Sequence, residues 1–250
     1  MHKLSIKNLT ASIEDKVILK NFDLEIKSGE IHVIMGPNGT GKTTISKIIM
    51  GDCNYKILEG DIYYDDKSIK NMTTDERARA GIFLGMQLPP EIEGVTNADF
   101  LRTALHTKEG QNFKLMQFIR ELDDTVEKLH MDPSMIHRSI NQGFSGGEKK
   151  KNEILQMYLL KPTTIILDEI DSGLDVDALK IVGENVMNYY QNNDCGILLI
   201  THYQRLLDYI KPDYVHIMMN GKIIKTGSAD LVQELEKNGY DSFLKEDTNE

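Results

Sequence analysis

The sequence predicts an α/β protein with a mainly parallel sheet at its centre, and short apolar runs are the first reason. These runs end in turn or charged residues and lie at 31–35, 165–167, 197–200 and 215–218. Runs of this length without strict alternation are typical of strands that helices cover on both faces. The chain has 250 residues, which suits one substantial core, so we expect a single domain that spans residues 1–250.

Two further regions complete the predicted fold. We expect antiparallel strands near the start of the chain, packed beside the main sheet, at 4–9, 17–19 and 22–26. From residue 99 to about residue 160 the apolar residues follow helical spacing, which predicts an inserted helical region. Asp132-Pro133 interrupts this region, because that pair favours a break between helices.

The composition is that of an ordinary globular domain. Hydrophobic residues make up 40% of the chain and charged residues 27%, which excludes disordered and fibrous classes. No apolar run approaches the roughly 20 residues that span a bilayer. The formal net charge of -10 has the wrong sign for nonspecific attraction to nucleic acid or anionic lipid. We therefore expect no nucleic-acid partner and no direct membrane insertion.

The cysteines and the N-terminus indicate a reducing compartment. Cys53 and Cys195 lie in no paired motif, so neither a zinc site nor a disulfide framework is expected. No apolar signal segment precedes the first predicted strand. The expected location is the cytoplasm, or the stroma of a plastid or apicoplast if a targeting peptide has been trimmed.

A glycine-rich loop follows the first buried run and leads into a helical stretch. Its residues fit the phosphate-loop pattern and are Gly36, Pro37, Asn38, Gly39, Thr40, Gly41, Lys42 and Thr43, followed by Thr44. Glycines let backbone amides converge on phosphates at a helix N-terminus. We expect Lys42 to reach the terminal phosphates of ATP and the Thr43 hydroxyl to bind Mg²⁺.

Polar residues follow two other buried runs. Asp168 and Glu169 come after 165–167, at the carboxyl end of a predicted parallel strand, where open α/β sheets bind ligands. Asp168 is expected to hold Mg²⁺ through water, and Glu169 to polarise the attacking water as general base. His202 follows 197–200 and is expected to contact the terminal phosphate and orient that water. Solvated strand ends and a structural histidine are the alternatives, which the phosphate loop disfavours.

A second glycine-rich segment begins a predicted helix. Ser145 and Glu148 form an S-x-x-E capping box, which is the simpler interpretation of this segment. A glycine-rich helix N-terminus also binds anions, so Ser145, Gly146 and Gly147 can present a hydroxyl and amides to a phosphate. That phosphate need not belong to the chain's own nucleotide. The lysine run 149–151 is expected to be the solvated first turns of a helix, with binding of a partner as the alternative.

In order and spacing, these motifs resemble those of ATP-binding-cassette ATPases. The motifs are the phosphate loop, Gln87 after an apolar run, 144–148, 165–169, 172–175 and His202. The resemblance covers nearly the whole chain and implies a P-loop NTPase with a RecA-like, mainly parallel sheet. It implies a head-to-tail dimer in which Ser145 and Gly147 of one subunit close over ATP held by the other. It also implies that Gln87 links Mg²⁺ to the helical insert and that Asp175 lies across the dimer seam.

The same resemblance sets the expected layout and the base contacts. A catalytic α/β core is expected at 1–87 and 161–250, with a helical subdomain at 88–160. The aromatic residue that stacks on adenine in many cassettes falls near Ile13. Adenine is therefore expected to be held by apolar contacts from Ile13 and Val17, with loose base selectivity.

Within that superfamily the sequence is similar to the SufC family, the ATPases of SUF iron-sulfur cluster assembly. The segments that carry this similarity are 34–39, 87–95, 144–157, 171–180 and 201–216. The similarity implies SufB-like and SufD-like scaffold partners and a second cassette in an ATP-dependent dimer. Glu148 stands where transporter cassettes usually carry Gln, a change that the SufC family shares, and its negative charge near a partner's phosphate could weaken closure.

Two other functions use related ATP chemistry. A transporter nucleotide-binding subunit differs in its partners, and only the segments 87–95 and 201–216 favour the SufC family over it. A chromosome or repair ATPase head needs a long inserted coiled coil, and no sustained heptad pattern occurs. Neither Cys53 nor Cys195 has the ligand spacing of an iron-sulfur cluster, which normally needs about four thiolates. The cluster scaffold is therefore expected to be the partner.

Overall fold

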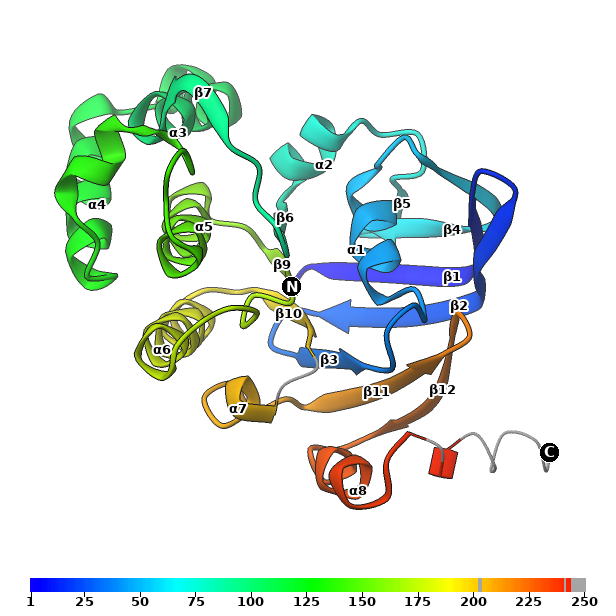
Figure 1. The fold of residues 1–250 in the computed structure, drawn as a ribbon. Coiled ribbons are helices and arrows are strands. Elements are labelled where there is room, and N and C mark those ends of the chain that lie inside the picture. The colour runs from blue at the N-terminus through cyan, green and yellow to red at the C-terminus, as the bar shows by residue number, and fades with distance from the viewer. Residues whose placement is uncertain (202–203, 241, 244–250) are drawn as a thin grey trace.

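The computed structural model describes residues 1–201, 204–240 and 242–243, and it confirms the α/β class (Figure 1). The central sheet has six strands in the order β12-β11-β3-β10-β9-β6. They are β3 (Ile31–Met35), β6 (Ile82–Gly85), β9 (Thr164–Asp168), β10 (Gly196–Ile200), β11 (Tyr214–Met219) and β12 (Lys222–Gly227). Neighbours pair in parallel except β11 with β12. All four predicted apolar runs lie in this sheet.

Both faces of the central sheet are buried, because side chains along each strand alternate between two cores. In β3, Val33 packs among helices on one face, while Ile34 packs with α1 (Lys42–Met50) and the N-terminal strands on the other. In β10, Leu199 and Leu198 divide in the same way. Every residue of β3 and β10 is buried, which explains why these runs show no alternation of polarity.

A second, antiparallel sheet has the order β2-β1-β4-β5. Its strands are β1 (Lys3–Ile13), β2 (Lys16–Lys27), β4 (Tyr55–Tyr64) and β5 (Lys67–Ser68). The predicted strands 17–19 and 22–26 are one strand, β2. The sequence does not predict β4, because Glu59 and Gly60 interrupt its apolar pattern. Glycine is required there, since a Cβ at position 60 would lie 2.4 Å from the Asn8 carbonyl oxygen.

Helices cover the central sheet and extend to one side of it. The remaining ones are α2 (Thr74–Ala80), α3 (Asn97–Glu109), α4 (Leu115–Lys128), α5 (Gly146–Leu160), α6 (Val176–Asn192), α7 (Gln204–Leu207) and α8 (Asp230–Asn238). α3, α4 and α5 lie together, away from the second sheet (Figure 1). Across the described ranges, no helix combines the length and apolar character that crossing a membrane requires.

The region between β6 and β9 is not purely helical. It also holds a short antiparallel sheet of β7 (Ile92–Thr96) and β8 (Ser139–Ile140), which the helical periodicity does not indicate. α4 buries Phe118, Leu122 and Val126 along one stripe, as the spacing predicts. The division of the chain into a core and a helical subdomain at residues 88 and 160 remains a prediction.

Candidate active site

The phosphate loop joins β3 to α1 and folds around Lys42. The Lys42 ammonium donates hydrogen bonds to the carbonyl oxygens of Gly36 and Pro37, both at 2.8 Å. The Thr40 hydroxyl donates to the Pro37 carbonyl at 3.0 Å. Gly41, just before α1, has a φ of 103°, a left-handed conformation that glycine adopts without strain. The loop therefore holds a cation at the N-terminus of α1, where backbone N–H groups also favour phosphate.

Two hydroxyl groups on α1 hold the carboxylate at the end of β9. Ser46 donates to Asp168 at 2.9 Å, and Thr43 donates to the other carboxylate oxygen at 3.3 Å. Burial raises the pKa of Asp168, and the hydrogen bond from Ser46 opposes this rise. Burial lowers the pKa of Lys42, against the attraction of Glu169 and Asp168. Ser46 is a site residue that the motif pattern misses, although it lies one helical turn beyond Thr43.

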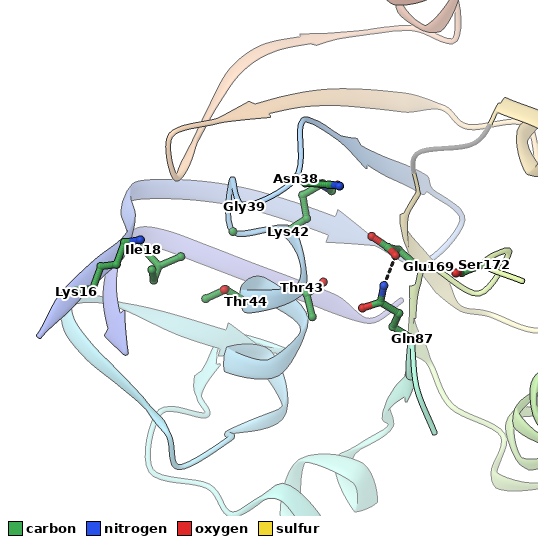
Figure 2. A pocket seen from close by; sticks show the side chains of 11 residues that line it. Lys16, Ile18, Asn38, Gly39, Lys42, Thr43, Thr44, Gln87, Glu169 and Ser172 are labelled. Atoms are coloured by element: carbon green, nitrogen blue, oxygen red, sulfur yellow. Dashed lines mark hydrogen bonds between the residues drawn. The ribbon is translucent and has the colours of Figure 1, made fainter. Parts of the chain in front are cut away.

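Gln87 and Glu169 face each other at the edge of the central sheet (Figure 2). Gln87 follows β6, and its side-chain amide donates a hydrogen bond to the Glu169 carboxylate. Glu169 has a φ of 46°, a left-handed conformation that costs a non-glycine residue on the order of 1–3 kcal/mol. Its backbone amide donates to the Ile200 carbonyl at 2.8 Å. Strain at a residue that presents a carboxylate is typical of a functional site.

The residues expected to bind Mg²⁺ are suited to it. Asp168 offers a carboxylate, Thr43 a hydroxyl oxygen and Gln87 an amide oxygen, and Mg²⁺ prefers such hard oxygen ligands. No cluster of three or more histidine, cysteine or acidic side chains suited to a metal occurs within the described ranges. This donor set fits a cation held by one or two carboxylates together with substrate phosphates.

The phosphate loop and the two facing residues line one cavity of about 560 Å³. Its lining residues are Lys16, Ile18, Asn38, Gly39, Gly41, Lys42, Thr43, Thr44, Gln87, Glu169 and Ser172. Lys16 and Ile18 lie at one end of the cavity, and Gln87, Glu169 and Ser172 lie at the other (Figure 2). The cavity thus brings a phosphate-binding loop next to a carboxylate that can act as a base.

At the end of the cavity that β2 forms, the lining residues are Lys16 and Ile18, not the expected Ile13 and Val17. Ile13 and Val17 do not line it, and Val17 is 38% exposed. Side chains alternate along a strand, so Lys16 and Ile18 share the face opposite to that of Val17. Contact of Ile13 and Val17 with adenine therefore remains a prediction. Lys16 and Ile18 are lining residues that the sequence analysis missed.

The second glycine-rich segment lies outside this cavity. Ser145 caps α5 as predicted: its hydroxyl accepts from the Glu148 amide at 3.3 Å, and Glu148 accepts from the Ser145 amide at 2.7 Å. Ser145, Gly146 and Asp175 are exposed. Asp175 caps α6, accepting a hydrogen bond from the Ala178 amide at 2.7 Å. An ideal Cβ at Gly146 would lie 3.7 Å from the Gly173 carbonyl oxygen, so the two segments adjoin.

The lysine run after this segment is not uniformly solvated, which corrects the expectation. Lys150 is 3% exposed and forms an ion pair of 3.2 Å with Glu153, which is 4% exposed. The helix turns Lys150 toward the protein interior, whereas Lys149 pairs with Glu91 at 2.8 Å nearer the surface.

The predicted catalytic residue His202 lies outside the described residues. Its neighbour Thr201, after β10, is buried, and its hydroxyl donates to Asp171 at 2.5 Å. Asp171 follows β9 by three residues, so this bond joins the segments that leave two adjacent strands. The role of His202 remains a prediction.

Comparison with known proteins identifies the family. A family model described as ABC transporter matches residues 19–172. Vegetative protein 296 of Bacillus subtilis (strain 168) is 55% identical over 245 residues, covering 97% of this chain and 94% of its own. The probable ATP-dependent transporter ycf16 of Cyanophora paradoxa is 52% identical over 242 residues, covering 95% and 93%.

Solved structures share the fold at lower identity. An ATP-binding subunit of an ABC transporter matches with a TM-score of 0.78 and 23% identity, covering 97% of this chain and 98% of the other. A dimeric ATP-binding cassette in a post-hydrolysis state, bound to ADP and Pi, matches with a TM-score of 0.77 and 21% identity, covering 90% and 98%.

The fold and the phosphate-loop cavity define an ATPase that binds ATP with Mg²⁺. The chain belongs to the ATP-binding-cassette family of ATPases. Its relatives also confirm the similarity to SufC-type ATPases that the sequence indicates.

Proposed function

We propose that this chain is the ATP-hydrolysing subunit of a SUF-type iron-sulfur cluster assembly complex. In this complex, ATP-driven pairing of two cassettes would change the conformation of SufB-like and SufD-like scaffold partners. The observation that carries the proposal is similarity to SufC-type relatives at 52% and 55% identity over 95% and 97% of the chain.

The proposed reaction uses the groups at one end of the cavity. The oxygen of a water molecule forms a bond to the terminal phosphorus of ATP as Glu169 accepts the water's proton. The bond from that phosphorus to the bridging oxygen breaks as the new bond forms, which releases ADP and inorganic phosphate. Gln87 holds the Glu169 carboxylate toward the cavity, and Lys42 balances charge on the phosphate oxygens. When bound by Thr43 and Asp168, Mg²⁺ would supply further charge neutralisation.

The exposed glycine-rich segment supports pairing of two cassettes. Ser145 and Gly146 are exposed at the start of α5 and do not line the chain's own cavity. A helix N-terminus that presents free amides attracts a phosphate, so this one suits the ATP of a second cassette. Asp175 lies in the adjoining segment, where we propose that it meets the partner cassette.

A groove beside the active site suits a scaffold partner. It has a volume of about 630 Å³ and includes the side chains of Met50, Leu84, Met86 and Leu88. Leu88 is 85% exposed and Met86 is 43% exposed, and apolar residues gathered at an exposed groove are typical of an interaction site. Gln87 and Asp168 also line this groove, so a partner bound there would adjoin the proposed Mg²⁺ ligands.

The test is affinity purification of the tagged chain, followed by identification of the captured proteins. We expect SufB-like and SufD-like proteins to be recovered with the parent chain, and recovery to fall for the double variant Met86→Asp and Leu88→Asp. The matched control is Leu58→Asp with Met116→Asp, exposed apolar residues of β4 and α4 that line neither the cavity nor the groove, which should leave recovery unchanged. Recovery of membrane subunits alone would refute the proposal and support a transporter subunit.

A further inference from the structure

The segment 86–91, which joins β6 to β7, makes three different kinds of contact. The Gln87 side chain donates to Glu169 in the active site. The side chains of Met86 and Leu88 are exposed in the neighbouring groove. The backbone of the segment, by contrast, is bound by side chains of α5. The same six residues therefore adjoin the catalytic cavity, a surface open to partners and the helix that Ser145 caps.

The backbone contacts come from a buried ion pair on α5. Glu153 accepts a hydrogen bond from the Met86 amide at 2.5 Å. Lys150 donates to the Met86 carbonyl and, at 3.0 Å, to the Gln87 carbonyl. Lys150 and Glu153 also pair with each other at 3.2 Å. The pair thus satisfies backbone groups on both sides of the Met86-Gln87 peptide bond.

Stability alone is a weak explanation for this pair. Burying two charges has a large desolvation cost, and buried pairs can often be replaced by apolar side chains without loss of stability. Both residues are at most 4% exposed. Apart from their bond to each other, the two side chains form hydrogen bonds to the backbone of Met86 and Gln87. These bonds indicate that the pair fixes the position of this segment.

Three asparagines fix the other end of the segment to the same helix. Asn141 donates to the Pro90 carbonyl at 2.9 Å. Asn152 of α5 donates to the side chains of Asn141 at 3.0 Å and Asn97 at 2.9 Å. All three asparagines are at most 2% exposed, so these bonds lie in the interior. α5 therefore holds the segment at Met86, at Gln87 and, through Asn141, at Pro90.

We propose that Lys150 and Glu153 are positioning residues that make segment 86–91 and the start of α5 move as one unit. A shift of Gln87 at one nucleotide would then shift Ser145, which caps the same helix and, under the proposed function, faces the nucleotide of the partner cassette. A partner that displaces Leu88 would, through the same link, shift both Gln87 and Ser145.

The test replaces the pair in a way that leaves no unpaired buried charge. In the double variant Lys150→Met and Glu153→Met, we expect kcat for ATP hydrolysis to fall about 10- to 100-fold, because small misplacement of catalytic groups has effects of this size. Nucleotide affinity, measured with a fluorescent ATP analogue, should stay within about twofold, because the phosphate loop is untouched. The matched control is Lys180→Met with Glu184→Met, an exposed pair of α6 at 3.8 Å, which should hydrolyse ATP at the parental rate.

Two outcomes would overturn the inference. One is a parental kcat in the folded double variant. The other is a parallel fall of affinity, kcat and melting temperature, which would assign the pair to fold support. If the double variant does not fold, hydrogen exchange on the parent chain decides: the Met86 amide should exchange as slowly as α5 amides, and fast exchange overturns the inference. Scaffold capture is measured separately, so its failure would refute the proposed function alone.

Discussion

The side-chain amide of Gln87 donates a hydrogen bond to the carboxylate of Glu169, joining the end of β6 to the end of β9. β9 pairs with β6 in the central sheet, so the two residues leave neighbouring parallel strands at the same edge. This bond fixes the direction of a carboxylate on a residue whose backbone is left-handed. The orientation of the proposed base therefore depends on a second residue far away in sequence.

Removing the Gln87 amide should slow hydrolysis without abolishing nucleotide binding. A hydrogen bond to a charged group contributes roughly 1.5–3 kcal/mol, so we expect Gln87→Leu to lower kcat about 10- to 100-fold. The matched control is Gln117→Leu, which breaks a Gln117–Glu121 bond of 2.8 Å on the exposed face of α4. Steady-state hydrolysis of both variants checks the prediction, and equal rates would contradict it.

Lys42 should govern affinity for the triphosphate. Its ammonium is the cation inside the phosphate loop, so Lys42→Ala should weaken ATP binding by roughly 10- to 100-fold, the value of a lost charge-assisted hydrogen bond. Lys47→Ala is the control, since Lys47 lies on the same helix but does not line the cavity. Titration with a fluorescent ATP analogue measures both, and unchanged affinity for Lys42→Ala would refute the assignment of the loop.

Arg77 should stabilise the far end of the helix that carries the phosphate loop. Arg77 is 2% exposed, and its guanidinium donates to the carbonyls of Ile48 and Ile49, both at 2.8 Å, at the end of α1. Arg77→Met would remove both bonds and leave the Ile48 carbonyl only its hydrogen bond from the Gly51 amide, at 3.0 Å. We expect a loss of about 3 kcal/mol in the free energy of unfolding. Urea unfolding measures this loss.

The control for Arg77 lies on the same helix. Arg79 pairs with Asp75 at 2.7 Å on the surface, and its side chain is 41% exposed. Arg79→Met should therefore lower the free energy of unfolding by less than about 0.5 kcal/mol. Similar losses for the two variants would show that the buried hydrogen bonds of Arg77 contribute little.

A buried histidine pair should make the fold sensitive to acid. His216 is 5% exposed, and its ring shares a hydrogen bond of 3.0 Å with the ring of His32. The other ring nitrogen of His216 is hydrogen-bonded to the Thr226 hydroxyl at 2.8 Å. The Glu30 carboxylate lies 3.1 Å from the ring of His32. Burial lowers the pKa of His216 to about 4. The unfolded chain takes up this proton near pH 6.5 and the folded chain only near pH 4. The stability that uncharged His216 contributes is therefore fully present above pH 6.5. As the pH falls from 6.5 to about 4, the free energy of unfolding decreases by on the order of 3 kcal/mol.

Substitution of that histidine checks this prediction. We expect His216→Gln to flatten the dependence of unfolding free energy on pH between about 6.5 and 4. His106→Gln, at an exposed position of α3, should leave the dependence as in the parent. If His216→Gln retains the full slope, other groups cause the acid sensitivity.

The central sheet and the phosphate loop were predictable because each depends on local pattern. β3 and β10 are buried on both faces, so their apolar runs are continuous, and the phosphate loop is a contiguous motif. β4 was not predictable, because its interior glycine is needed only when β1 lies beside it. The sequence pattern predicts two strands at 17–19 and 22–26 where the structure has the single strand β2, because Lys20 and Asn21 are both exposed and break the alternation of burial.

The parts of the site that depend on three-dimensional contacts could not be derived from spacing. Ser46 joins the site only through Asp168, which is more than a hundred residues away. Lys150 sits in a lysine run typical of a solvated face, yet the helix turns it toward Met86 and Gln87. Which side of β2 faces the cavity depends on strand register, and this decides between Val17 and Ile18.

The role of Glu169 as general base is tested most directly by the rate of ATP hydrolysis by Glu169→Gln, measured together with its affinity for ATP. In the proposed reaction the Glu169 carboxylate accepts the proton of the attacking water, so an amide at this position should lower hydrolysis by about 10²- to 10⁴-fold. ATP affinity should be unchanged, since the phosphate loop holds the nucleotide. Hydrolysis by Glu169→Gln at the parental rate would show that Glu169 is not the general base.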